Sequence, residues 1–322
     1  MSIKNILKKT LITIALPAGM FLLMLIITRA CGVDYYGSSD MWRTILTKLI
    51  YTIPMSCGIA MQLSNGRMDF SGGSTMILAS IVGTSIAADY FGRSPYAMLI
   101  FCIVFGVIIS EVTAAVYVTT KLPIIICTIG MALIYEALTL LVCGGNGVDI
   151  LSDSTMNIFG RMPVGLFILA AAMILYYLVT NKTTVGRRGR LLSRGQSMAV
   201  NIGVNEKKNV MLIFLFSGIL FGLGAAVYAS QEKVTTQSEL STASILFKNI
   251  AAVYIGRFIG KASTEVIGIA MGALAVQLMN YGLNAVGYGS GGWDNIVFGI
   301  FMMSFWVAIA MSEAKKGSEV SF

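Results

Sequence analysis

Long apolar runs, separated by short polar segments, constrain this chain more than any other feature of its sequence. The first run extends from Leu11 to Ile27, and a helix needs about 20 such residues to cross the hydrocarbon core of a bilayer. Among the 322 residues, 56% are hydrophobic and 12% are charged, whereas soluble domains carry about twice that charged fraction. We therefore predict an all-α, polytopic membrane helical bundle that forms a single transmembrane domain over residues 1–322.

The N-terminal run also has features of a secretory signal. Lys4, Lys8 and Lys9 precede it, and a Thr-Arg-Ala-Cys sequence ends at Cys31. The apolar part of a signal peptide spans only about 7 to 15 residues, which is shorter than this run. We therefore expect a first transmembrane helix that starts in the cytoplasm and is kept in the mature protein.

The pattern of apolar runs predicts about ten spans with both termini in the cytoplasm. Their approximate ranges are 11–27, 45–63, 73–88, 96–118, 122–142, 163–179, 209–229, 247–259, 264–284 and 294–311. The segment 247–259 is short. If it crosses, the positive-inside rule places Lys121, Lys261 and the C-terminal lysines in the cytoplasm and the loop around Asp149 outside. We therefore interpret it as a helix that passes through the bundle interior.

The segment Asn65 to Ser74, called the motif segment below, interrupts the apolar pattern between the second and third runs. It contains an arginine, an aspartate, two serines and three glycines. In hydrocarbon, such a break persists only where it lines a cavity, is buried in protein or reaches the membrane surface. The residues alone leave two interpretations open. Asp69 is either solvated in a cytoplasmic turn or part of a functional site.

The segment 181–208 holds seven lysines and arginines and a single acid, Glu206, so we place it in the cytoplasm. A short helix over Gln196 to Asn201 is suited to a groove of a partner protein, to which Ala199 and Gly203 would allow close approach. The alternative is that the basic residues only fix topology. We favour that alternative for three of them, Arg187, Arg188 and Arg190.

The rest of the composition argues against chemistry within the chain. It has no histidine, and its five cysteines are scattered without paired spacing, so no metal, resident cofactor or disulfide framework is predicted. The formal charge of +8 is typical of cytoplasmic loops, so no nucleic acid partner is expected. No P-loop sequence is present, and we predict that the chain is not an enzyme and does not hydrolyse ATP.

Several polar residues lie within the apolar runs. Asn280 and Asn284, four apart on one helix face, either hydrogen-bond to other helices or face a translocation path. We interpret Glu111 and Glu136 as paired carboxylates or as carboxylates that reach the interface, with a proton relay as the alternative. On the same run as the asparagines, Gly268 and Gly272 have the four-residue spacing of close helix packing.

Four stretches together resemble the membrane subunit of ribose-type ABC importers. Residues 66–74 follow the family's Gly-Gly-Ile-Asp-Leu-Ser-Val-Gly-Ser, with Arg67 at its second glycine and Gly72 at its valine. Residues 121–131 are similar to its Lys-x-Pro-Pro-Phe-Ile-Val-Thr-Leu-Gly-Met sequence, and residues 186–205 to its ATPase-contacting loop. Residues 250–284 follow its C-terminal pattern.

The resemblance implies an importer permease whose partners are ABC ATPase subunits, a periplasmic or lipid-anchored solute-binding protein, and a second permease subunit, identical or related. It also implies a location in the bacterial inner membrane, surrounded by membrane lipid. The implied ATPase-coupling loop covers residues 181–208, and its implied coupling residues are Arg194, Ala199, Gly203 and Asn205. The implied translocation or gating residues are Asp69, Ser71, Gly72, Gly73, Ser74, Asn280 and Asn284.

With the topology included, we place the motif segment at the inner end of the second and third spans. There we expect Asp69 and Ser71 to cap the helix that Gly72 and Gly73 begin, which is a structural and gating role, not solute binding. The expected solute is a sugar, with a nucleoside or a sugar-derived signal as alternatives. A proton-coupled secondary transporter would instead use Asp69, Glu111 or Glu136 as coupling acids. Nothing in the chain resembles the filter of an ion channel.

Overall fold

The computed structural model describes residues 3–260, 263–289 and 292–319. Lys261, which we placed in the cytoplasm, lies outside these residues. Across the described ranges the chain consists of helices joined by turns, with one isolated antiparallel bridge between Val148 and Val234. The predicted all-α class is therefore confirmed.

The described helices coincide closely with the expected spans. The long ones are α1 (Ile3–Ala30), α2 (Ser39–Ser64), α3 (Gly72–Tyr90), α4 (Pro95–Thr120), α5 (Ile124–Leu141), α6 (Val164–Tyr177), α9 (Glu206–Gln231), α10 (Ala243–Gly260), α11 (Glu265–Ala285) and α12 (Trp293–Glu319). The short ones are η1 (Val142–Gly145), η2 (Met156–Gly160), η3 (Leu178–Lys182), α7 (Thr184–Arg194) and α8 (Gln196–Asn201). Within the described residues, eight helical segments are long and apolar enough to cross a membrane, namely α1, α2, α4, α5 continued by η1, α6 continued by η3, α9, α10 and α11.

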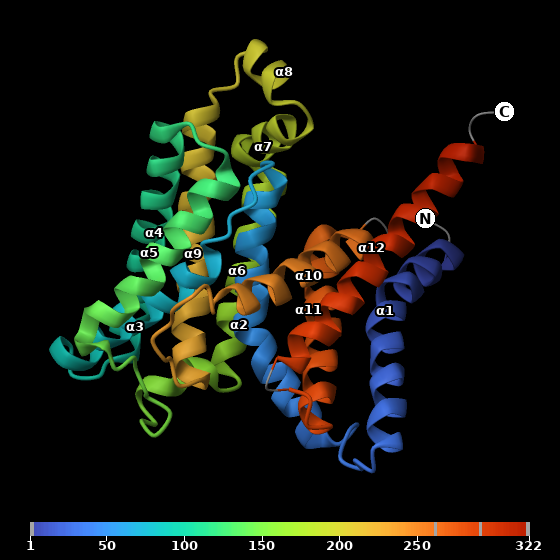
Figure 1. Ribbon diagram of the computed structural model, residues 1–322, viewed down its shortest axis with the longest axis horizontal. Coiled ribbons are helices and arrows are strands. Elements are labelled where there is room, and N and C mark those ends of the chain that lie inside the picture. The colour runs from blue at the N-terminus through green and yellow to red at the C-terminus, as the bar shows by residue number, and fades with distance from the viewer. Residues whose placement is uncertain (1–2, 261–262, 290–291, 320–322) are drawn as a thin grey trace.

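Two helices form the centre of the bundle. In α2 and α9, 72% and 67% of the most apolar stretch is buried, against 33% in the peripheral α4. Figure 1 shows α3, α4, α5 and α9 on one side of α2 and α1, α11 and α12 on the other, with α10 running obliquely between them. The helices α7 and α8 project at the top, in the half of the view where α1 begins and α12 ends.

Glycines bring neighbouring helices into close contact. A Cβ atom on Gly106 of α4 would lie 2.6 Å from the carbonyl oxygen of Gly218 on α9. On α11, a Cβ on Gly268 or Gly272 would lie 2.9 Å from a backbone nitrogen of α10. The predicted packing role of Gly268 and Gly272 is therefore confirmed, and α10 and α11 pack as one antiparallel pair.

The start of α3 lies inside the bundle, and this corrects our placement of the whole motif segment at the inner end of the spans. Gly66 packs against Ser193 at the end of α7, but Gly72 already packs against Phe221 of α9. Since Phe221 follows Glu206 by fifteen residues, it lies about 22 Å along α9 from the start of that helix. The motif segment therefore runs into the bundle, and α3 begins part-way along α9.

The α10 helix is longer than its apolar run suggests. We expected a helix over 247–259, whereas α10 covers Ala243–Gly260 and has 18 residues. The extra residues, Ala243 to Leu246, include a serine that interrupts the apolar pattern. A buried carboxylate, described below, stabilises the backbone that leads into this first turn.

Candidate solute pathway and coupling site

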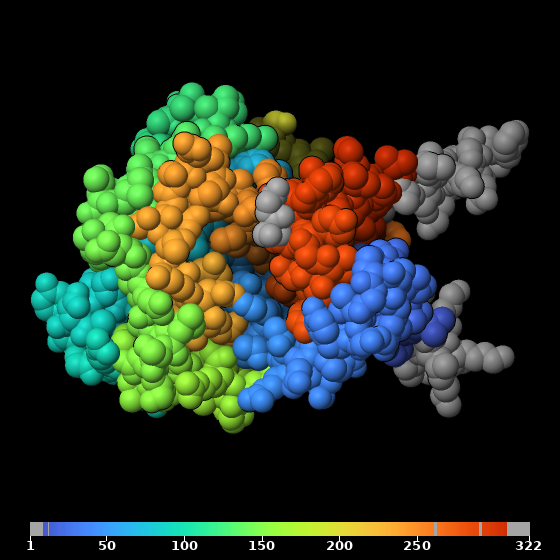
Figure 2. All heavy atoms as spheres, turned by 60° about the horizontal axis from the view of Figure 1, so that its bottom comes forward, coloured from blue at the N-terminus to red at the C-terminus, as the bar shows by residue number. Residues whose placement is uncertain are grey.

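A polar pocket opens between α2, α9, α10 and α11, with a volume of about 330 Å³. This is at the low end of the range of about 300 to 1,000 Å³ for small-molecule sites. Figure 2 shows the hollow on this face between the orange chain around residues 230–250 and the red helices. We call it the outer pocket. It is lined by Thr44, Ile45, Lys48, Tyr51, Thr52, Tyr228, Glu232, Ile245, Lys248, Asn249, Val276, Gln277, Asn280, Tyr281 and Asn284.

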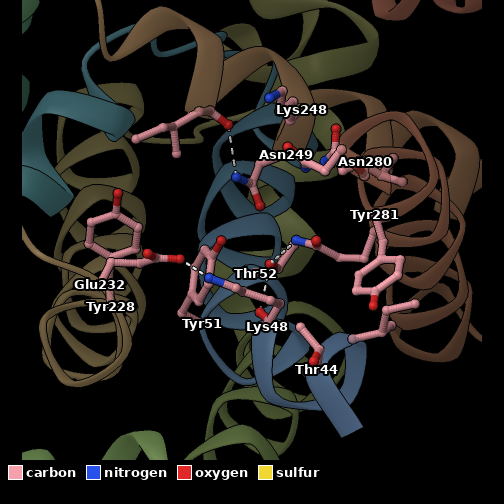
Figure 3. A pocket seen from close by; sticks show the side chains of 15 residues that line it. Thr44, Lys48, Tyr51, Thr52, Tyr228, Glu232, Lys248, Asn249, Asn280 and Tyr281 are labelled. Atoms are coloured by element: carbon pink, nitrogen blue, oxygen red, sulfur yellow. Dashed lines mark hydrogen bonds and ion pairs between the residues drawn. The ribbon is translucent and has the colours of Figure 1, made fainter. Parts of the chain in front are cut away.

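Uncharged polar groups and aromatic rings make up much of this lining (Figure 3). The rings of Tyr51 and Tyr228 meet edge to face with centroids 5.2 Å apart. The Gln277 amide donates to the Thr52 hydroxyl at 2.8 Å, which links α11 to α2. Amides and hydroxyls both donate and accept hydrogen bonds, so the pocket matches a solute that carries several hydroxyl groups.

Two ion pairs balance the charge in and beside the pocket. Lys48 of α2 pairs with Glu232, which follows α9, and Figure 3 shows this contact reaching across the pocket. On α10, Lys248 pairs with Asp294 of α12 at 3.0 Å. Each ammonium therefore has a carboxylate partner, and the balanced charge suits an uncharged solute more than an anion.

The motif segment forms a second, separate polar site, because none of its residues lines the outer pocket. Asp69 is 4% exposed. One of its carboxylate oxygens accepts a hydrogen bond from the Gln62 amide at 2.8 Å, and the same amide donates to Ser217 at 3.0 Å. Asp69 thus joins α2 and α9 through a buried network, and the solvated-turn interpretation is wrong.

The second Asp69 oxygen organises the start of α3. It accepts hydrogen bonds from the backbone N–H and from the hydroxyl of Ser71, each at 2.7 Å. Ser71 occupies the N-cap position, but its side chain makes no capping hydrogen bond to the helix. Capping by Ser71 itself is therefore wrong. The Ser71 hydroxyl instead lies 3.5 Å from that of Thr113 on α4, which is 2.8 Å from the Tyr135 hydroxyl on α5.

The glycines that follow Ser71 permit close packing at the beginning of α3. A Cβ on Gly72 would lie 3.0 Å from the Phe221 ring, and one on Gly73 would lie 2.7 Å from the carbonyl oxygen of Thr242. The Ser74 hydroxyl donates to the Ser71 carbonyl at 2.9 Å. These three predicted residues thus form the packed beginning of α3, away from the outer pocket.

Glu136 differs from our interpretation as a paired or interfacial carboxylate. It is 1% exposed, and it accepts hydrogen bonds from the backbone N–H of Leu240 and from the N–H and hydroxyl of Thr242. A carboxylate near a helix N-terminus is favoured by the helix dipole. Glu136 therefore fixes the chain that enters α10, and this buried contact could not be identified from a lone glutamate in an apolar run.

The segment 181–208 folds into α7, α8 and the start of α9. The predicted helix Gln196–Asn201 is confirmed as α8. Ala199 packs in a small core with Leu192 and Val204, whereas Met198 and Ile202 are 72% and 66% exposed. An apolar pair exposed on a charged segment is typical of a contact with another protein, and these two side chains lie on α8 and at its C-cap.

The other predicted coupling residues have distinct environments. Gly203 has φ +90°, and a Cβ there would meet no heavy atom within 4 Å. Asn205 is the N-cap of α9, and its side chain accepts from the Lys208 N–H at 3.0 Å. Arg194 is exposed at the end of α7. Gly203 and Asn205 therefore shape the link between α8 and α9.

A family model described as the permease component of branched-chain amino acid transport systems matches residues 41–305. The chain belongs to this permease family. It is similar to the D-allose transport system permease protein of Escherichia coli strain K12, with 24% identity over 83% of each chain. It is also similar to the ribose import permease protein of Bacillus subtilis strain 168, with 22% identity over 72% of this chain and 73% of the relative.

A third relative is the galactose/methyl galactoside import permease protein of Haemophilus influenzae, with 24% identity over 85% of this chain and 88% of the relative. No solved structure matches the chain. The family and these relatives consist of transport permease subunits. The chain is therefore a multi-pass transport subunit of the inner membrane and not an enzyme.

The structure brings only part of the predicted translocation set together. Asn280 and Asn284 line the outer pocket, while the motif residues belong to the buried network. Sequence reasoning missed the other polar lining groups, chiefly Lys48, Tyr51 and Asn249. One signal was present, because Lys48 is an ionisable residue within an apolar run, and such residues mark solute or ion pathways in membrane proteins.

Proposed function

We propose that this permease carries a neutral monosaccharide, or a solute of similar size and hydroxyl content, through the outer pocket into the cytoplasm. The observation that carries the proposal is the pocket itself, in which amide and tyrosine groups combine with paired charges. The named solutes of the three relatives, D-allose, ribose and galactose or methyl galactoside, are of this chemical kind.

The proposed topology has ten spans, which are the eight long apolar helices together with α3 and α12. In this arrangement the basic segment 181–208 and both termini lie in the cytoplasm. The outer pocket is lined by the first half of α2, the end of α9, the start of α10 and the second half of α11. All four of these parts lie toward the outside in that topology, where a binding protein delivers solute.

The proposed driving partners are ABC ATPase subunits that dock on α8, together with a second permease subunit, identical or related. The exposed Met198 and Ile202 side chains provide the contact. Asp69, Ser71, Gly72, Gly73 and Ser74 are proposed to act in gating, because they join the start of α3 to its neighbouring helices.

The test is uptake of labelled D-ribose, D-allose and D-galactose by cells that lack their own importers for these sugars. The chain is expressed with the ATPase and binding-protein genes that accompany it. We expect uptake of at least one sugar, and loss of that uptake when the P-loop lysine of the ATPase is replaced. Uptake that persists without a functional ATPase would contradict the proposal and favour a secondary transporter.

A further inference from the structure

The motif segment contains a buried arginine whose charge is balanced by another part of the chain. Arg67 is 6% exposed. A guanidinium nitrogen of Arg67 pairs with the carboxylate of Glu206, and the guanidinium carbon lies 5.4 Å from the centroid of the Tyr117 ring. Removing one partner of a buried ion pair leaves an uncompensated charge. The contact between Arg67 and Glu206 is therefore strongly favoured wherever Arg67 is buried.

The Glu206 oxygen that pairs with Arg67, Oε1, also binds the short cytoplasmic helix α8. Gln196, the first residue of α8, donates its side-chain N–H to Glu206 Oε1 at 2.7 Å. A single carboxylate oxygen thus accepts hydrogen bonds from both the motif segment and α8. Because hydrogen bonds to an ionised acceptor are stronger than neutral ones, Glu206 couples the positions of Arg67 and Gln196.

Two further contacts attach the motif segment to the same cytoplasmic unit. The Asn209 amide of α9 donates to the side-chain oxygen of Asn65 at 3.1 Å. A Cβ on Gly66 would lie 3.0 Å from Ser193 Cα, so the backbones of the motif segment and α7 are in close contact. The beginning of the motif segment is therefore held against α7 and the start of α9.

The other end of the motif segment leads into the bundle. Asp69 follows Arg67 by two residues, and its carboxylate accepts from Gln62 and Ser71. Two residues of extended chain span at most about 7 Å. Arg67 is therefore connected to Asp69 and to the start of α3 by a short stretch of chain.

We propose that the Arg67–Glu206–Gln196 contact is the link by which movement of α8 reaches the motif segment, with Arg67 as its positioning residue. The inference rests on the proposed function, in which α8 receives the ATPase. It concerns a pairing between two segments 139 residues apart in the chain, and it assigns a role to an arginine that the sequence pattern left unexplained.

The first test needs no solute or partner. Hydrogen–deuterium exchange of the full chain in detergent is compared between the parent protein, Arg67→Met and Gln196→Ala. Loss of a hydrogen bond to a charged group corresponds to a change of about tenfold or more, so both variants should speed exchange in residues 196–204 by that factor. Arg188→Met, which removes an exposed arginine of α7, should leave it unchanged. Unchanged exchange in Arg67→Met would overturn the proposal.

The second test uses the complex with its ATPase and binding protein in nanodiscs, supplied with D-ribose, D-allose or D-galactose. We expect Arg67→Met to raise the number of ATP molecules hydrolysed per sugar imported. The rate of ATP hydrolysis measured without sugar should stay the same as in the parent complex. Because Arg67 and Gln196 act through one carboxylate, the double variant should be no worse than the more severe single variant. Additive effects of the two substitutions, or an unchanged ratio of ATP hydrolysed to sugar imported in Arg67→Met, would overturn the link. A parent complex that imports no sugar would contradict the proposed function alone, since the exchange test still decides the link.

Discussion

Glu136 on α5 accepts two hydrogen bonds from Thr242, one from its backbone N–H at 2.9 Å and one from its hydroxyl at 2.6 Å. Thr242 precedes α10, and its carbonyl oxygen packs against Gly73 at the start of α3. The beginnings of α3 and α10 therefore meet at one residue inside the bundle. The Asp69 carboxylate lies at the start of α3, and the Glu136 carboxylate lies at the start of α10. The protein itself therefore compensates the positive ends of both helix dipoles.

Replacing Glu136 by glutamine tests this arrangement. The substitution keeps the shape but turns one acceptor oxygen into a donor, which then faces an N–H or hydroxyl donor of residues 240–242. Leaving a buried donor unsatisfied costs about 1 to 3 kcal/mol, so Glu136→Gln should lower the thermal unfolding midpoint of the purified protein. Glu111→Gln is the matched control, because one Glu111 carboxylate oxygen has no hydrogen-bond partner. Equal midpoints for the two variants would contradict the capping role.

Gly73 tests the contact between the two helix beginnings. A Cβ at this position would lie 2.7 Å from a backbone oxygen that cannot rotate away. Gly73→Ala should therefore destabilise the protein by about 1 to 3 kcal/mol, as overpacking does. Gly130→Ala on α5 is the control, since a Cβ there meets nothing within 4 Å. Removing a helical glycine should stabilise by about 0.5 to 1 kcal/mol. Denaturation of both variants and of the parent protein in the same detergent measures the change in the free energy of unfolding.

Asn280 tests the outer pocket. Asn280→Leu keeps a similar volume but removes both the donor and the acceptor from the lining. Leaving a solute hydroxyl unpaired costs about 1 to 3 kcal/mol, or roughly fivefold to over a hundredfold in the apparent KM for uptake. Ile267→Leu, on the same helix and 42% exposed, serves as control. If Asn280→Leu transports with parent kinetics, the pocket is not on the solute path.

Met198 and Ile202 test docking on α8. Changing both to aspartate places charge on the exposed apolar pair and should abolish copurification with the ATPase subunits, because a charge buried in an interface without a partner is strongly unfavourable. The fold should persist, since both side chains are exposed. Ser197→Ala, at an exposed neighbour on the same helix, should retain the ATPase. Normal copurification of the aspartate variant would place the ATPase elsewhere.

Asp69 tests the gating role of the motif segment. Asp69→Ala removes the acceptor shared by Gln62 and Ser71, so it should reduce transport or assembly without altering which sugars are carried. The measurement is competition of unlabelled sugars against one labelled sugar. A changed order of preference would argue that Asp69 contacts solute.

The helices could be predicted from the sequence because membrane spans depend on local composition. A run such as 209–229 must satisfy its backbone internally, and a helix is the structure that does so. The helix at Gln196–Asn201 was likewise predicted, as a short segment held between charged flanks. These features depend on neighbours in sequence.

The site depended on contacts between distant residues and was predictable only in part. Asn280 and Asn284 could be chosen because their spacing puts them on one face. Lys48 could not be assigned to a pocket until its partner Glu232, which follows it by 184 residues, was known. The depth of the motif segment was misjudged for the same reason, because the buried Asp69 accepts from Gln62 of α2, which in turn donates to Ser217 of the distant α9.

The motif segment also affects how easily the helices packed around it can shift relative to one another. The backbone N–H groups of Phe70 and Ser71 bond to side chains, those of Thr128 and Asp69, and not to helical carbonyls. Shifting this stretch therefore breaks a few side-chain hydrogen bonds and leaves every helical turn intact. Since hydroxyl and carboxylate partners can be exchanged for water, the barrier to such a shift is far lower than that for unwinding a transmembrane helix.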